Sequence, residues 1–229
     1  MIEFQEASVV VDTPDGELTV LAATTLSLGE QRIGIIGANG SGKSTLARMI
    51  NGLVEPTSGH VLVDGRDVAE DGREVRKRVG FVFTQPDSQL VMPTVVEDVM
   101  LSLRRVERDK NARKARAMEM LDAIGLADKA DVTVHALSGG QKQLLALAGV
   151  LATDPDVVVA DEPTTLLDLR NTIAVADRLF SMRPQLVLVS HDLDLMDQCD
   201  RVLVVDAARV VFDGAPAAGV AHYRGLVRT

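Results

Sequence analysis

The chain has 229 residues and a formal net charge of −9, and 46% of its residues are apolar although only 3% are aromatic. This length suits one large domain with an aliphatic core, and the acidic balance argues against a protein that grips nucleic acid through a basic face. One cysteine, Cys199, excludes an internal disulfide, and the longest apolar runs fall well short of the ~20 residues that cross a bilayer.

The first third of the chain predicts strands around a glycine-rich loop. Residues 1–36 show short alternating strands with a turn at 12–16, and residues 33–36 form a buried strand that leads into glycines. A helix is expected after Lys43, because Leu46, Met49 and Ile50 recur at helical spacing. Strands at 61–63 and 79–83 follow, separated by a polar stretch.

Helical patterns dominate the middle of the chain. Thr94 and Glu97 form a capping-box signature before a helix that extends through Leu103. A second helix is expected at about 107–124, where Gly125 ends it. A third follows a glycine motif near 138 and extends through 151. We therefore expect a helical insert over residues 86–140.

The last third alternates between strands and helices. Strands are predicted at 157–160, 186–189 and 202–205, with helices at 171–182 and 192–198. This alternation indicates an α/β fold with a parallel sheet that is covered by helices.

A phosphate-binding motif, G-x-x-x-x-G-K-[ST], lies between a predicted strand and a predicted helix. Its glycines let successive N–H groups point at phosphates, and the following helix N-terminus favours negative charge. Lys43 would reach the β- and γ-phosphates of ATP, and the Ser44 hydroxyl would bind Mg²⁺. The predicted ATP-binding residues, called the nucleotide loop below, are Gly37, Ala38, Asn39, Gly40, Ser41, Gly42, Lys43, Ser44 and Thr45.

Three further polar residues follow strands of the predicted sheet. Asp161 and Glu162 end the apolar run 157–160, and His191 follows the run 186–189. Because ligands bind beyond the carboxyl ends of parallel strands, these residues are expected near the nucleotide loop. There Asp161 would hold Mg²⁺, Glu162 would accept a proton from the attacking water, and His191 would contact the γ-phosphate and steady that water.

A second glycine motif precedes the third helix of the middle segment. Taken alone, Ser138 and Gln141 form a capping box, and the two glycines between them only tighten the turn. Its occurrence together with the nucleotide loop and the acidic strand favours a phosphate-binding role instead. The residues of this signature segment are Leu137, Ser138, Gly139, Gly140 and Gln141.

In this order and spacing, the motifs resemble those of the nucleotide-binding subunits of ABC transporters over essentially the whole chain. The resemblance implies one domain, 1–229, with a P-loop ATPase core, a small antiparallel β subdomain and a helical subdomain at about 86–140. It implies a head-to-tail dimer, homodimer or heterodimer, in which the signature segment of one copy faces the ATP of the other. It also implies that Glu162 is the catalytic base and that Asp168 communicates across the dimer.

Residues 79–99 also resemble the ATPases of energy-coupling-factor uptake systems, and residues 161–168 are most similar to the biotin-uptake branch. The resemblance implies an integral membrane transporter subunit, a substrate-binding membrane protein and a place on the cytoplasmic face of the inner membrane. Gln89 is expected at the surface that meets the membrane subunit. Because the chain stops at Thr229 soon after its last predicted strand, the dimer is expected to depend on ATP or on that subunit.

Two positions depart from the family pattern. The family glutamine that contacts Mg²⁺ directly follows the aromatic at position 83, but Thr84 stands there and Gln85 comes one residue later. Either residue is a candidate, and Gln85 is the assigned metal ligand with Ser44 and Asp161. The aromatic that stacks on adenine is missing from residues 11–13, so weak discrimination between bases is expected.

Several alternatives remain open at this point. The ATPase could serve cobalt, nickel or another vitamin, or an ordinary ABC transporter. A soluble ABC ATPase of DNA repair, translation or cluster assembly is a rival from another class, opposed by the acidic charge and the lack of a long coiled-coil insert. A regulatory module without turnover is opposed by intact Lys43, Glu162 and His191.

Overall fold

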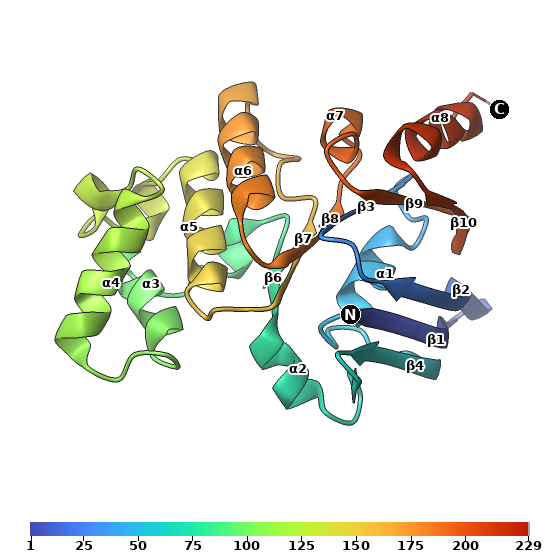
Figure 1. Cartoon of the computed structure of the whole chain (residues 1–229), viewed down its shortest axis with the longest axis horizontal. Helices are drawn as coiled ribbons and strands as arrows, with labels where there is room; N and C mark the ends of the chain where they lie inside the picture. Colours follow the sequence, from blue (N-terminus) through green and yellow to red (C-terminus); the bar gives the residue numbers. More distant parts are fainter. Residues whose placement is uncertain (229) are drawn as a thin grey trace.

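The computed structural model describes residues 1–228, and its centre is a six-stranded sheet (Figure 1). The strand order is β10-β9-β3-β8-β7-β6, in which β10 is antiparallel to β9 and the other five strands are parallel. The strands are β3 (Arg32–Gly37), β6 (Val79–Val82), β7 (Val157–Asp161), β8 (Gln185–Val189), β9 (Arg201–Asp206) and β10 (Arg209–Gly214). The predicted α/β class with a parallel sheet is confirmed.

A four-stranded antiparallel sheet in the order β2-β1-β4-β5 lies beside the larger sheet (Figure 1). Its strands are β1 (Ile2–Thr13), β2 (Gly16–Leu28), β4 (Ser58–Val63) and β5 (Arg66–Asp67). The helix α1 (Lys43–Met49) buries Leu46, Ala47 and Met49 in the core that joins the two sheets. This packing fixes α1, whose first three residues are the end of the nucleotide loop.

Four helices pack in a second core on the opposite side of the six-stranded sheet. They are α5 (Gly139–Leu151), α6 (Leu169–Ser181), α7 (Leu193–Met196) and α8 (Pro216–Leu226). Cys199 is buried in this core, and burial raises the pKa of its thiol to about 12, with Asp200 adding to the effect and Arg32 opposing it. A thiol with such a pKa is protonated at neutral pH and is a poor nucleophile.

The third core lies between helices at one end of the molecule. Here α3 (Val95–Leu103) and α4 (Lys110–Asp122) pack with short 3₁₀ helices against α5 (Figure 1). The capping box of Thr94 and Glu97 is present. The helix expected from 107 begins only at Lys110, because the Asp109 carboxylate accepts a hydrogen bond from the backbone N–H of Ala112 and caps the helix there.

Several elements have no counterpart among those predicted from the sequence, among them α2 (Gly72–Arg78), β10 and α8. The helix α2 buries only Gly72 and Val75, so it carries no apolar periodicity. The prediction that the strand at 202–205 is the last element is wrong, because the strand β10 and the helix α8 follow it. The turn before β10 has Ala207 and Ala208 at φ 43° and 62°, conformations for which glycine or asparagine is the usual signal.

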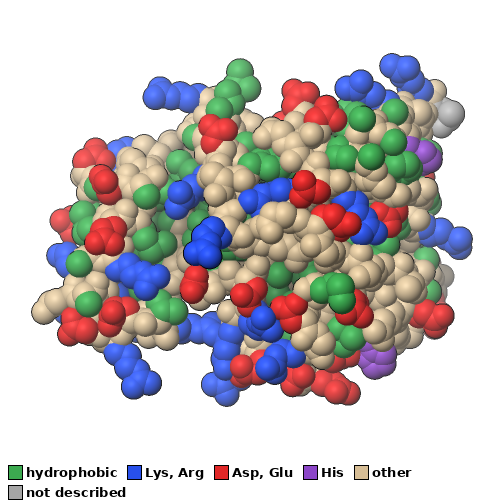
Figure 2. Space-filling model, viewed as in Figure 1, with side chains coloured by type: hydrophobic (Ala, Val, Ile, Leu, Met, Phe, Trp, Pro, Cys, Tyr) green, Lys and Arg blue, Asp and Glu red, His purple; other side chains and the backbone are tan. Residues whose placement is uncertain are grey.

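Within residues 1–228, no helix is both long and apolar enough to span a bilayer. On the face shown in Figure 2, acidic and basic side chains are interspersed and neither sign gathers into one large patch.

Candidate functional site

The nucleotide loop connects β3 to α1, and its glycines are required by their backbone conformation or by close neighbours. Gly40 and Gly42 adopt φ 78° and 103°, values that side chains disfavour. A Cβ atom at Gly37 would lie 2.1 Å from the carbonyl oxygen of Val205, and one at Gly42 would lie 2.6 Å from that of Val20. The loop therefore takes its shape by backbone packing against both sheets.

The hairpin turn of β9 and β10 fastens the same loop. The backbone N–H of Ala208 donates to the carbonyl of Ser41 at 3.0 Å, and the carbonyl of Ala208 accepts from the N–H of Ala22 on β2 at 2.7 Å. Within the described chain, the buried hydroxyl of Ser41 has no hydrogen-bond partner. An unsatisfied buried donor inside a glycine-rich loop fits a loop that receives phosphate oxygens.

Lys43 begins α1 and is nearly buried, with 6% of its side chain exposed. Its Nζ lies 3.3 Å from the carbonyl oxygen of Ala38, 3.5 Å from Oδ1 of Asn39 and 3.7 Å from Oε1 of Glu162. These contacts are long or involve neutral partners. A buried ammonium in such surroundings is suited to an anion that comes from outside the protein.

Asp161 ends β7 and presents its carboxylate to α1. Its Oδ1 accepts a hydrogen bond from the Ser44 hydroxyl at 2.8 Å, and its Oδ2 accepts one from Nη2 of Arg48 at 2.9 Å. A carboxylate beside a hydroxyl is the kind of oxygen donor set that Mg²⁺ accepts. In the described chain, no three acidic, histidine or cysteine side chains lie close enough together to form a metal site of their own.

Glu162 follows in an unusual backbone conformation with φ 52°. Its Oε2 lies 2.8 Å from Nδ1 of His191 and accepts a hydrogen bond from the Thr165 hydroxyl at 2.7 Å. The Glu162 side chain is 12% exposed, whereas His191 is 57% exposed. The structure therefore brings together Lys43, Glu162 and His191, which the sequence placed near each other, and adds Thr165, which the sequence analysis did not single out.

Thr84 and Gln85 take different positions after β6. The Thr84 hydroxyl donates to the backbone carbonyl of Asp161 at 2.7 Å, which ties the ends of β6 and β7 together. Gln85 is exposed at the start of a 3₁₀ helix. The side chain of Gln89, expected at the surface, is half-buried and lies between the N–H of Phe83 and the carbonyl of Ala146 at 3.5 and 3.3 Å.

The signature segment forms the N-terminus of α5. Ser138 and Gln141 make both bonds of the capping box, at 3.1 and 3.3 Å. A Cβ atom at Gly140 would lie 2.2 Å from the Asn171 side chain on α6, which begins where the Asp168 carboxylate accepts from the N–H of Asn171 at 2.9 Å. Hence α5 and the segment at Asp168 lie side by side.

Among the described residues, no hydrogen bond or ion pair connects the signature segment to the nucleotide loop. The two motifs that resemble phosphate-binding elements thus do not form one site within a single copy through such contacts.

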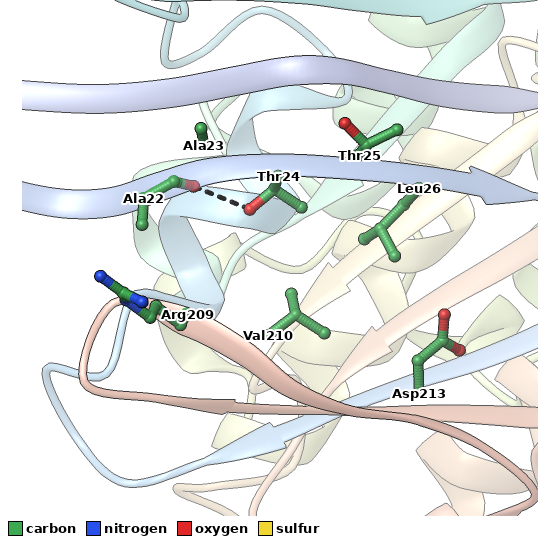
Figure 3. A pocket seen from close by; sticks show the side chains of 8 residues that line it. All are labelled: Ala22, Ala23, Thr24, Thr25, Leu26, Arg209, Val210 and Asp213. Atoms are coloured by element: carbon green, nitrogen blue, oxygen red, sulfur yellow. Dashed lines mark hydrogen bonds between the residues drawn. The ribbon is translucent and has the colours of Figure 1, made fainter.

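A cavity of about 580 Å³ lies between β2 and β10 (Figure 3). Leu26 and Val210 face each other across it, Arg209 lies at one end, and Asp213 lies at the other. None of the predicted site residues lines this cavity. It begins beside Ala208, the residue that fastens the nucleotide loop.

The stretch expected to hold adenine carries no ring. Val11, at the end of β1, is 40% exposed, and the Thr13 hydroxyl donates to the carbonyl of Gly16 at 2.7 Å across the turn. Aliphatic surface is thus available to a base at this position.

The sequence profile of the family described as "ABC transporter" matches residues 22–165. Among curated relatives, an ABC transporter ATP-binding protein of Deinococcus radiodurans is 46% identical over 98% of this chain and 97% of its own length. The biotin transport ATP-binding protein of Rhizobium etli is 41% identical over 98% of both chains. The methionine import ATP-binding protein of Caulobacter vibrioides is also 41% identical, over 94% of this chain and 67% of its own length.

Two solved structures are similar throughout. One is the dimeric post-hydrolysis state of an ATP-binding cassette bound to ADP and Pi, with a TM-score of 0.85 and 28% identity over 94% of this chain and 99% of that one. The other is cbiO1 of Clostridium perfringens, part of the ABC transporter complex cbiONQ, with a TM-score of 0.82 and 30% identity over 99% and 92% of the two chains.

Proposed function

Because the chain belongs to the ABC transporter family as an ATP-binding subunit whose ATP hydrolysis is coupled to transport, we propose that it powers micronutrient uptake, with biotin the first candidate, through an energy-coupling-factor transporter. The similarity to a biotin transport protein and to a subunit of cbiONQ supports this finer assignment. One observation carries the chemistry: Lys43, Ser44, Asp161, Glu162 and His191 converge at the carboxyl ends of neighbouring strands.

In the proposed mechanism, the nucleotide loop binds the phosphates of ATP through its backbone N–H groups, and Lys43 moves from Glu162 to the β- and γ-phosphates. Ser44, Asp161 and Gln85 would hold Mg²⁺, which supplies charge neutralisation at the phosphates. Glu162, held by Thr165 and His191, accepts the proton of the water that attacks the γ-phosphate. His191 contacts the γ-phosphate from the neighbouring strand end.

The second half of each ATP site comes from another copy. The signature segment begins a capped helix, whose N-terminus favours the negative charge of a γ-phosphate. The dimeric state of a similar cassette supports this assignment. Asp168, beside the signature helix, then lies where it can relay the state of one site to the other.

We assign residues 1–229 to one domain and residues 86–140 to the helical subdomain that passes motion to the membrane subunit. The assembly would lie on the cytoplasmic face of the inner membrane, with a transmembrane coupling subunit and a separate substrate-binding membrane protein. A second candidate function is an ATPase of an ordinary ABC importer, which the equal identity to a methionine import protein favours.

Purification of the tagged chain from detergent-solubilised membranes distinguishes these functions. Uptake of the energy-coupling-factor type predicts two hydrophobic partners, one of which binds biotin, and biotin uptake that stops in a Lys43→Ala strain. Partners of an ordinary importer would support the second candidate. Recovery of soluble proteins or nucleic acid alone would contradict both transport functions.

The Glu162→Gln variant tests the ATPase mechanism itself. Loss of the proton acceptor should lower turnover by about 10²-fold or more while ATP still binds, so the variant should elute as a dimer on gel filtration with ATP. The unchanged protein and the Lys43→Ala variant serve as controls. Elution of the Glu162→Gln variant as a monomer at saturating ATP would contradict the shared-site mechanism.

A further inference from the structure

Two donors on α1 hold the same carboxylate. Ser44 and Arg48 are four residues apart, which places them one helical turn apart on one face of the helix. The Ser44 hydroxyl donates to Oδ1 of Asp161 at 2.8 Å, and Nη2 of Arg48 donates to Oδ2 at 2.9 Å. The orientation of the carboxylate is thus set by one helix face.

Because Asp161 is buried, its carboxylate depends on these two contacts for stabilisation. Its side chain is 2% exposed, and a buried carboxylate is costly unless it is paired and hydrogen-bonded. Because Arg48 occupies Oδ2, the other oxygen remains directed at Ser44. The Nε of Arg48 is buried without a partner, so the guanidinium gives up one of its own hydrogen bonds in this position.

Resting on the proposed function, we propose that Arg48 is a positioning residue for the Mg²⁺ that accompanies ATP. By holding Oδ2, it presents Oδ1 of Asp161 together with the Ser44 hydroxyl as a preformed pair of oxygen ligands. Arg48 touches neither the metal nor the nucleotide and acts only through Asp161. Partners that orient a metal ligand in this way typically contribute 10–100-fold to metal affinity.

The alternative is a purely structural ion pair between α1 and β7. Such a pair would influence stability, but its loss would leave metal affinity unchanged in protein that remains folded. A measurement of metal affinity therefore distinguishes a positioning role of Arg48 from a purely structural one, and no measurement of catalytic rate is needed.

The test compares Arg48→Gln and Arg48→Lys with an Arg104→Gln control, which changes an exposed arginine at the end of α3. Two quantities are measured: nucleotide affinity in EDTA with a fluorescent ATP analogue, and Mn²⁺ affinity by electron paramagnetic resonance with a non-hydrolysable analogue bound. We expect Arg48→Gln to weaken Mn²⁺ about tenfold or more and to keep its nucleotide affinity in EDTA. Arg48→Lys should recover part of the loss.

Wild-type Mn²⁺ affinity in folded Arg48→Gln protein would overturn the proposal. If Arg48→Gln does not fold, Arg48→Lys decides, because the shorter lysine side chain cannot place its ammonium where Nη2 lies. Unchanged Mn²⁺ affinity in that variant would again overturn the proposal. Failure of the ATP-site assignment on which the proposal rests would look different, since the wild-type protein would then bind no nucleotide even in EDTA.

Discussion

The position of the Glu162 side chain is fixed by contacts with neighbouring residues rather than by the strand that precedes it. Its backbone is in the left-handed region at φ 52°, and its carboxylate is held by Thr165, His191 and, more loosely, Lys43. Such a conformation costs on the order of 1–3 kcal/mol and persists where surrounding contacts fix it. The carboxylate of Glu162, the proposed catalytic base, is therefore in place before any nucleotide binds, whereas Lys43 has only a long contact with Glu162 to break.

The base of the nucleotide is the least restrained part of the expected ligand. Since Val11 offers only aliphatic surface to a base, GTP should be hydrolysed within about tenfold of ATP. A Val11→Tyr variant should bind both nucleotides more tightly through ring stacking. Parallel rate measurements on ATP and GTP test this, and far slower hydrolysis of GTP by the unchanged protein would refute it.

Some residues of the candidate site can be predicted from the sequence, and others cannot. Lys43, Ser44 and Asp161 follow from a motif and from a strand end, because their chemistry depends on local spacing. Arg48 and Thr165 could not be singled out, because their value lies in contacts with Asp161 and Glu162 that exist only after folding.

At the level of secondary-structure elements, two adjacent glycines at the start of α5 have different structural roles. Gly140 packs against Asn171, where a Cβ atom would lie 2.2 Å away, whereas a Cβ atom at Gly139 would meet only ordinary contact with Leu167 at 3.8 Å. Gly140→Ala should lower the free energy of unfolding by about 1–3 kcal/mol through overpacking. Gly139→Ala should leave stability unchanged or slightly higher, because alanine favours the helix.

Denaturant unfolding of both variants measures this difference. If the signature segment faces the ATP of another copy, Gly139→Ala should nevertheless weaken ATP-dependent dimerisation in the Glu162→Gln background. Equal loss of stability in the two variants would contradict the packing assignment.

The elements that the sequence predicted and those that it missed differ in how they are stabilised. Strands β7 and β8 are continuous apolar runs because both faces of the sheet are covered. The helix α2 has no such signal, since most of its surface is exposed. The turn into β10 has no sequence signal, because Ala207 and Ala208 occupy turn positions at which glycine is usual.

For the molecule as a whole, Asp67 links stability to acid pH. Burial alone would raise the pKa of its carboxyl, but the N–H groups of Ala69 and Glu70 and the ring of His60 together hold it below the usual value of 3.8. A carboxyl whose pKa is lower in the folded than in the unfolded protein stabilises the fold at pH values above its unfolded-state pKa. That stability is lost as the pH falls through the native pKa.

Asp67→Asn should therefore flatten the loss of stability below about pH 4, while Asp122→Asn, at an exposed position, should not. Unfolding by denaturant over a series of acid pH values measures both. An acid limb of the same slope in Asp67→Asn and in the unchanged protein would refute the assignment.

The turn at Ala208 has a consequence for protection of the backbone against solvent. Its carbonyl bonds β2 at Ala22, and its N–H bonds the nucleotide loop at Ser41. Opening of the two sheets beside the cavity of Figure 3 would strain the first bond, and movement of the loop would strain the second, so the two motions are coupled through Ala208. Phosphates that immobilise the loop should slow amide hydrogen exchange at Ala22 and Ala208. These two amides would thus report nucleotide occupancy from positions that no phosphate touches.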